Sequence, residues 1–149
     1  MNTAGTNVRS EQLEQYSTLE YILLGDLRDL LEDSDDEVTC KWLLAVLEAL
    51  LDTLPREFDL EEQDGYLLEV LENYPNWVEE VNRLRSQHGS LFNRLTELRE
   101  QILRRTSYAA IADQLRRDLR DWMMTLIAHH RHENRLLQTA LNLEVGVGD

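Results

Sequence analysis

Apolar side chains recur along this chain at alternating intervals of three and four residues, which is the spacing of one face of an α-helix. Four long segments share the pattern. The third is the most regular, and its stripe reads Trp77, Val81, Leu84, His88, Leu91, Leu95, Leu98 and Ile102. Two prolines and six glycines supply little turn chemistry for a sheet protein. We therefore predict an all-α fold, an antiparallel up-down-up-down four-helix bundle with short links.

Capping and breaking residues suggest where the helices end. Residues 1–9 are small, polar and without a period, so we expect a flexible N-terminus and a first helix capped by Ser10. Ser34-Asp-Asp-Glu37 has the spacing of a capping box and predicts a second helix from about residue 35. Pro55 predicts a kink in that helix, and Asp64-Gly65 predicts its end. A short helical piece through about Glu72 and a break over residues 73–76 precede a third helix that ends near residue 105.

The length and charge of the chain limit the classes of protein to which it can belong. With 149 residues it fits one domain, which we place at residues 10–143 with a flexible tail at 144–149. The net charge of −14, all of which arises in the first half of the chain, argues against nucleic acid and anionic membranes as partners. Cys40 is the only cysteine, so no internal disulfide is possible. Because the sequence also lacks a signal peptide and a long apolar run, we expect a soluble cytoplasmic protein.

Polar residues occupy several positions where the helical pattern requires core residues. The second stripe contains Glu57 and Glu61, the third His88, and the fourth His129 and Glu133. Burying an unpaired carboxylate costs several kcal/mol, so such groups stay inside a protein when they pair with each other or bind a cation. Imidazoles and carboxylates without a thiolate suit iron, manganese or zinc. Metal binding is the leading hypothesis from these residues, and Glu20 on the first stripe can add a fourth carboxylate.

Less specific interpretations of the same residues remain open. His88 can be a hydrogen-bonded core histidine, and His129 and Glu133 can simply pair with each other. Glu57 and Glu61 can form a solvated face if a kink at Pro55 rotates the stripe. His130 and His132 lie beside the seam and are interpreted as surface residues.

A common site requires the polar residues to lie at one height in the bundle. A fourth helix capped by Ser107 would misplace His88 and His129 by roughly 5 to 10 Å at 1.5 Å of rise per residue. A loose connection over residues 108–113 would bring them level, and we favour that interpretation. The fourth helix should then continue to about Leu143.

Three short motifs include the polar stripe positions. Glu57-Phe-Asp-Leu-Glu61, with Gln63-Asp-Gly-Tyr66-Leu soon after, is similar to the second-helix motif of the hemerythrin-like, or HHE cation-binding, family, and the resemblance extends over roughly residues 10–149. Leu84-Arg-Ser-Gln-His88 resembles the entry to its third-helix motif, and His129-His-Arg-His-Glu133 with the following residues resembles its fourth helix. The resemblance implies a four-helix bundle around a non-haem di-iron site.

Through this resemblance, Glu61, His88 and His129 correspond to metal-ligand positions of the family. Glu57 stands where a His is expected, Phe92 where the second third-helix His belongs, and Asn134 where Asp is usual. Glu133 is then the nearest carboxylate, and Glu20, or else Tyr16 or Tyr21, replaces the first-helix His.

The predicted metal ligands are therefore Glu20, Glu57, Glu61, His88, His129 and Glu133. With these ligands, we expect a di-iron protein of oxygen or iron sensing or storage, with metal ions and dioxygen as its partners. The alternatives are a metal-free interaction module and a small di-iron oxidase or peroxidase.

Overall fold

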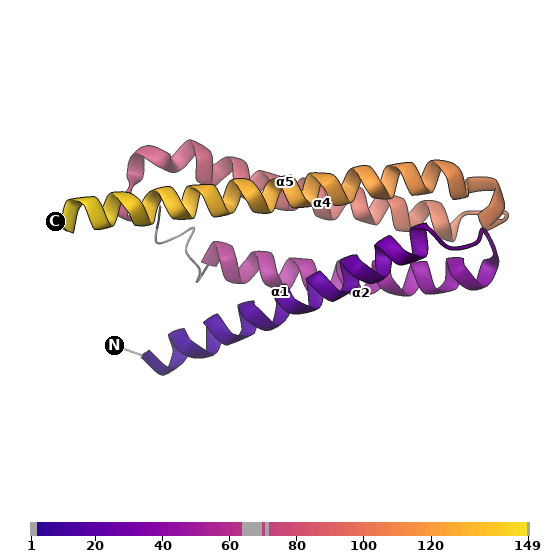
Figure 1. Cartoon of the computed structure of the whole chain (residues 1–149), viewed down its shortest axis with the longest axis horizontal. Coiled ribbons are helices and arrows are strands. Elements are labelled where there is room, and N and C mark those ends of the chain that lie inside the picture. Colours follow the sequence, from indigo (N-terminus) through magenta and orange to yellow (C-terminus); the bar gives the residue numbers. More distant parts are fainter. Residues whose placement is uncertain (1–2, 64–69, 71, 149) are drawn as a thin grey trace.

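The computed structural model describes residues 3–63, 70 and 72–148, and this part of the chain is helical without a strand. Its elements are α1 (Thr3–Leu31), α2 (Glu37–Gln63), the short 3-10 helix η1 (Pro75–Trp77), α4 (Val78–Leu103) and α5 (Tyr108–Gly148). The long helices pack as a bundle, and both ends of the chain lie at the same end of it (Figure 1). The prediction of an all-helical bundle is confirmed.

The first and last helices are longer than predicted. α1 begins at Thr3 rather than at Ser10, and α5 continues to Gly148 rather than ending near Leu143. The expected flexible segments are thus helical over residues 3–9 and 144–148. Apolar periodicity reports where a helix packs against neighbours, whereas an established helix can propagate beyond that region through its own backbone hydrogen bonds.

Hydrogen bonds at the starts of α2 and α5 show which residues cap these helices. Asp36, rather than Ser34, caps α2, because its carboxylate accepts a 2.8 Å hydrogen bond from the Thr39 amide. Ser34 donates to that carboxylate. α5 begins directly after Ser107, whose hydroxyl accepts from the Ala110 amide at 3.3 Å. The favoured loose connection over residues 108–113 was therefore wrong, and the Ser107 alternative was right.

Part of the second link cannot be compared with its prediction. The expected end at Asp64-Gly65 lies outside the described residues, and α2 is described to Gln63. Val70 and Glu72 are helical, as expected for the short piece, and Asn73, which was placed in the break, is helical as well. Pro55 lies inside α2, and a kink there stays a prediction.

Ion pairs join the acidic first half of the chain to the second half where the two short turns meet. Arg105 donates to Glu37 at 2.7 Å, and the other Glu37 oxygen accepts from the Tyr108 amide. Arg116 pairs with Asp35, and Arg120 donates to the carbonyl of Leu31 at the end of α1. These contacts hold the α1–α2 turn against the start of α5 and so define one end of the bundle.

A polar layer separates two apolar clusters inside the bundle. The larger cluster fills the end near the turns and includes Leu47, Leu95 and Leu119. The smaller cluster, at the opposite end, consists of Val70, Val81, Leu84, Leu136 and Ala140. Along α4, His88 falls between them, since Leu84 belongs to the smaller cluster and Leu91 to the larger. The polar layer is therefore closed by apolar side chains above and below.

The N-terminal half of α1 diverges from the other helices (Figure 1). Leu13 and Tyr16 on its inward stripe are only half-buried, whereas Leu23 and Leu27 nearer the turn are buried. The other side chains from Glu11 to Leu19 are exposed. The described side chains of this half therefore bury little apolar surface against the bundle. Among the described residues, no helix is long and apolar enough to cross a membrane.

Replacing Gly89 with alanine should stabilise the fold. Gly89 lies in the middle of α4, and a Cβ atom added there would meet nothing within 4 Å. Glycine inside a helix costs roughly 0.5–1 kcal/mol relative to alanine, so we expect the melting temperature to rise by about 1–4 °C. Thermal unfolding of the metal-free protein tests this, and a lower melting temperature would contradict a regular helix at this position.

Candidate metal centre

All six residues predicted as metal ligands are buried. Their exposed fractions lie between 1% for Glu57 and 4% for Glu20 and His88. The alternative in which Glu57 and Glu61 form a solvated face is therefore wrong. The remaining question is which of the six the fold brings together.

Four of them form a first cluster in the polar layer, made by Glu61 of α2, His88 of α4, and His129 and Glu133 of α5. One potential ligand atom from each lies within 4.8 Å of the others. His88 Nε2 is 3.3 Å from a Glu61 oxygen and 3.4 Å from a Glu133 oxygen, and His129 Nε2 is 2.9 Å from the same Glu133 oxygen. Carboxylates and imidazoles from three helices thus surround one point.

The first cluster forms even though Ser107 caps α5. Side chains of an α-helix lean toward its N-terminus. Because residue numbers fall along α4 as they rise along the facing α5, seen in the contacts Leu91–Trp122 and Gln87–His129, the leans are opposite in space. His88 leans away from the turn, while His129 and Glu133 lean toward it. The lean compensates for the offset in height that argued for a looser connection.

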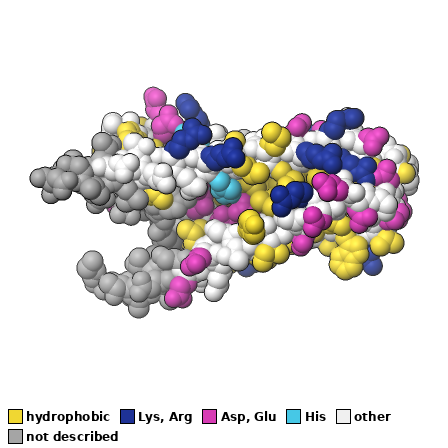
Figure 2. All heavy atoms as spheres, viewed as in Figure 1, with side chains coloured by type: hydrophobic (Ala, Val, Ile, Leu, Met, Phe, Trp, Pro, Cys, Tyr) yellow, Lys and Arg dark blue, Asp and Glu magenta, His cyan; other side chains and the backbone are white. Residues whose placement is uncertain are grey.

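A second cluster consists of Glu20 of α1, Glu57 of α2 and His130 of α5. His130 Nε2 lies 2.7 Å from a Glu20 oxygen. A histidine and acidic side chains are visible together on the face where α1 diverges from α5 (Figure 2). Glu57 and Glu61 are one turn apart on α2, and His129 and His130 are adjacent on α5, so the two clusters are neighbours.

The interpretation of His130 as a surface residue was wrong. α5 contacts both α4 and α1, so its buried face is wider than a single seam. A weaker signal was present beside the first stripe, since Met123, His130 and Leu137 recur every seven residues and are half-buried, although Ile127 between them is exposed. His132 is half-buried and pairs with Glu80 at 3.0 Å, outside both clusters.

Two residues that the sequence did not single out contact the outer nitrogens of the first cluster. His88 Nδ1 lies 3.0 Å from a Glu62 oxygen, and His129 Nδ1 lies 2.6 Å from the Gln87 amide oxygen. Phe58 stacks on the His88 ring with centroids 3.9 Å apart. Neither Glu62 nor Gln87 belongs to an apolar stripe, and no periodicity could have revealed them.

Several atoms of these clusters are buried without a hydrogen bond. Within the described part of the chain, they include Glu57 Oε2, Glu61 Oε2 and His129 Nε2. The last two lie within 3.3 Å of an ion-pair partner, which is His88 for Glu61 and Glu133 for His129. Because an amide oxygen only accepts, the Gln87 contact favours a proton on His129 Nδ1, and His129 Nε2 faces the cluster with a Glu133 oxygen at 2.9 Å. Such unsatisfied buried acceptors are suited to a cation.

The pKa values of the clustered side chains are shifted in the direction that retains protons. Burial and the nearby carboxylate of Glu20 raise the pKa of Glu57 to about 10. Burial also raises the pKa of Glu61 to about 7 against the opposing contact with the His88 imidazole. Burial alone would lower the pKa of His88, but the carboxylates of Glu133, Glu61 and Glu62 around the ring outweigh it and raise this pKa to about 9. Near neutral pH, part of the negative charge is therefore neutralised by bound protons.

The residues present fit two divalent cations. The buried carboxylates of Glu20, Glu57, Glu61 and Glu133 carry four negative charges when ionised, which two divalent ions would balance. The first cluster offers two nitrogens and two carboxylates, and the second offers one nitrogen and two carboxylates. A donor set of nitrogen and oxygen without sulfur suits iron, manganese or zinc. The second cluster has fewer protein ligands, so a cation held there would have more room for a further ligand.

The residues that depart from the hemerythrin-like pattern can be located in the structure. Tyr21 is 78% exposed and Tyr16 is half-buried, whereas Glu20 is buried, so only Glu20 of these three belongs to a cluster. Phe92 lies in a pocket between α2 and α4 beside His88. Asn134 is exposed, and Glu133 supplies the carboxylate of α5.

Comparisons with known proteins leave the family open. No family model matches the sequence, and no solved structure matches the fold. One segment is 40% identical over 47 residues to the cell cycle protein GpsB of Latilactobacillus sakei subsp. sakei (strain 23K), a match that covers 32% of this chain and 37% of that protein. The matched segment spans little more than a third of the curated relative, which is too little of either chain to define a family.

Proposed function

We propose that this protein is a hemerythrin-like bundle that binds two metal ions, expected to be iron, and acts in oxygen or iron sensing or storage. The observation that carries the proposal is the convergence of buried ligand atoms from Glu61, His88, His129 and Glu133 within 4.8 Å. His129 Nε2 and Glu61 Oε2 lack hydrogen bonds there, and a bound cation would satisfy both.

The fold proposed to hold this centre is an antiparallel up-down-up-down four-helix bundle. The course of the chain in Figure 1 supports it, as does the contact of Glu37 in the first turn with Arg105 and Tyr108 in the last. Contacts between α4 and α5 support it too, since Tyr74, just before α4, donates to the distant Ala140 carbonyl while Leu91 accepts from Trp122. Such a bundle allows facing helices to contribute ligands to one interior layer.

Each residue has a definite part in the proposed centre. His88 and His129 would bind the first ion through Nε2, together with Glu61 and Glu133. Glu20, Glu57 and His130 would hold the second. Bound iron would supply reversible redox chemistry and affinity for small oxygen ligands. The protein's part is to orient the ligands, exclude bulk water with the apolar clusters on both sides, and hold protons on carboxyls such as Glu57 when the metal is absent.

Metal analysis of protein purified without an affinity tag, together with its ultraviolet–visible spectrum, tests the proposal. We expect two irons per chain after anaerobic loading with ferrous iron and exposure to air, with new absorption in the near ultraviolet. Turnover with peroxide would favour the oxidase or peroxidase alternative. Failure to bind iron, zinc or manganese would overturn the proposal and leave the metal-free interaction module.

A further inference from the structure

The outer nitrogens of both imidazoles in the first cluster face side chains that can accept a hydrogen bond. Glu62 Oε1 lies 3.0 Å from His88 Nδ1, and Gln87 Oε1 lies 2.6 Å from His129 Nδ1. In each ring the other nitrogen, Nε2, faces the cluster. An acceptor on Nδ1 fixes both the rotation of the ring and the position of its proton.

These two outer residues are neighbours of inner ones along the chain. Glu62 follows Glu61 on α2, and Gln87 precedes His88 on α4. Each of the two helices therefore places one residue in the cluster and the adjacent residue against the imidazole of the next helix. In this way α2 supports His88 of α4, and α4 supports His129 of α5. Neither contact can form unless the helices have the correct relative rotation.

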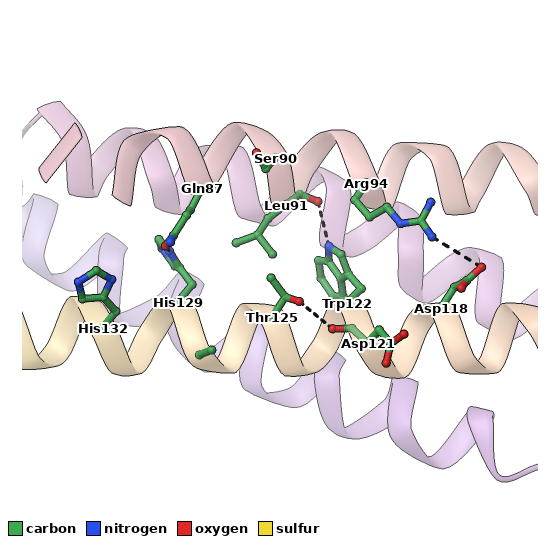
Figure 3. Close-up of a pocket in the computed structure, with 11 residues that line it drawn as sticks. Gln87, Ser90, Leu91, Arg94, Asp118, Asp121, Trp122, Thr125, His129 and His132 are labelled. Atoms are coloured by element: carbon green, nitrogen blue, oxygen red, sulfur yellow. Dashed lines mark hydrogen bonds and ion pairs between the residues drawn. The ribbon is translucent and has the colours of Figure 1, made fainter. Parts of the chain in front are cut away.

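Both outer contacts lie in surface pockets on either side of α4. A pocket of about 610 Å³ between α4 and α5 is lined by Gln87, His129, Ser90 and Trp122 among others. Figure 3 shows Gln87 and His129 pointing toward one another across this pocket. A smaller pocket of about 330 Å³ between α2 and α4 is lined by Phe58, Glu62 and His88. Water can reach both pockets, so an unsupported imidazole could rotate or change tautomer there.

We propose that Gln87 and Glu62 are positioning residues that direct the Nε2 lone pairs of His129 and His88 into the centre and thereby set its affinity for metal. This inference rests on the proposed function. The carboxylate of Glu62 makes His88 the stronger donor, because a negatively charged acceptor on Nδ1 increases the basicity of the ring. The neutral amide of Gln87 orients His129 without adding charge. A role limited to filling the pockets would require only the bulk of these side chains.

The Gln87 contact is tested by comparing Gln87→Leu, which keeps the bulk, with Gln87→Glu, which keeps an acceptor. Zinc is the probe because it is redox-inactive, and a competing chromophoric chelator reports its affinity. We expect Gln87→Leu to lower zinc affinity by about 10- to 100-fold and Gln87→Glu to stay within a few-fold of the wild type. Ser90→Ala, in the same pocket but without a contact to His129, is the matched control and should bind as the wild type does.

The Glu62 contact is tested in the same way with Glu62→Leu and Glu62→Gln. Glu62→Leu should lose about 10- to 100-fold in zinc affinity, and Glu62→Gln should lose less because it retains an acceptor. Asp59→Asn, which alters an exposed acid of the same pocket, controls for the change in charge. Wild-type affinity in both leucine variants would overturn the proposal, as would equal losses in Gln87→Leu and Gln87→Glu.

A metal-free readout separates this inference from the proposed function. Long-range ¹H–¹⁵N correlation spectra of the imidazoles should show a proton on Nδ1 of His129 in the wild type, where the Gln87 oxygen accepts it. Gln87→Leu should move that proton toward Nε2, while Ser90→Ala should not. If the wild type bound no metal, the proposed function would fail, but these spectra would still decide whether Gln87 positions the ring. An unchanged tautomer in Gln87→Leu would overturn the positioning role.

Discussion

A variant with alanine at both His88 and His129 is expected to lose more than about 100-fold in affinity for iron or zinc at the first position. Both Nε2 atoms face the cluster, and their removal leaves only the carboxylates of Glu61 and Glu133 there. The iron content of the double variant should fall from two per chain to at most one, because the second cluster retains His130. Isothermal titration with zinc and elemental analysis after iron loading provide the measurement.

His132→Ala is the matched control for this experiment. His132 lies on the same helix, is half-buried and pairs with Glu80, but it belongs to neither cluster. Its removal should leave metal content unchanged. Because Phe58 stacks on His88, the single variant His129→Ala should be measured as well, with circular dichroism to show that the fold persists. Wild-type metal content in the folded double variant would contradict the assignment of the first cluster.

Replacing Glu57 with leucine should stabilise the metal-free protein while weakening metal binding. Glu57 is 1% exposed, and its Oε2 makes no hydrogen bond among the described residues. Removing an unsatisfied buried polar group in favour of an apolar one of similar size is worth roughly 1–3 kcal/mol. A gain of about 2 kcal/mol would raise the melting temperature by about 4–8 °C. Thermal unfolding with and without zinc measures both effects.

The stabilisation by Glu57→Leu should also grow with pH. The folded pKa of Glu57 is raised to about 10, so above the unfolded value near 4.5 the unfolded state loses a proton that the folded state keeps. Wild-type stability without metal therefore falls as pH rises from about 5 toward 10, by at most about 1.4 kcal/mol per pH unit from this group. The leucine variant lacks this loss. A gain that is the same at pH 5 and pH 8 would contradict a proton held on Glu57 in the fold.

The inward faces of the helices could be predicted well from the sequence. On α4, every stripe residue from Val81 to Ile102 is buried, as the three-four spacing requires. Glu57, Glu61, His88, His129 and Glu133 were recognised because each interrupts such a stripe, and all five are buried. Local capping chemistry was less decisive. Asp36 rather than Ser34 caps α2, since both can accept a backbone hydrogen bond and the path of the turn selects one of them.

The relative heights and rotations of the helices could not be predicted in the same way. Counting residues from the turn predicted that His129 and His88 lie at different heights along the bundle. The opposite lean of side chains on the two facing helices compensates for this offset. His130 was missed because α5 contacts α1 as well as α4, and the contact of His130 with Glu20 depends on where α1 lies. Glu62 and Gln87 carry no periodic signal, so only the packing of three helices reveals their contacts.

By itself, the sequence determined that four long helices form and which residues of each one face inward, because helical periodicity and the cost of burying charge act within a single segment. It also favoured the burial of carboxylates and imidazoles without deciding it, since a solvated face for Glu57 and Glu61 stayed open. Only the tertiary structure decided that they divide into two clusters, that His130 joins one of them, and that Glu62 and Gln87 support the other. Those contacts join residues far apart in the chain, and their geometry depends on how whole helices rotate and slide against one another.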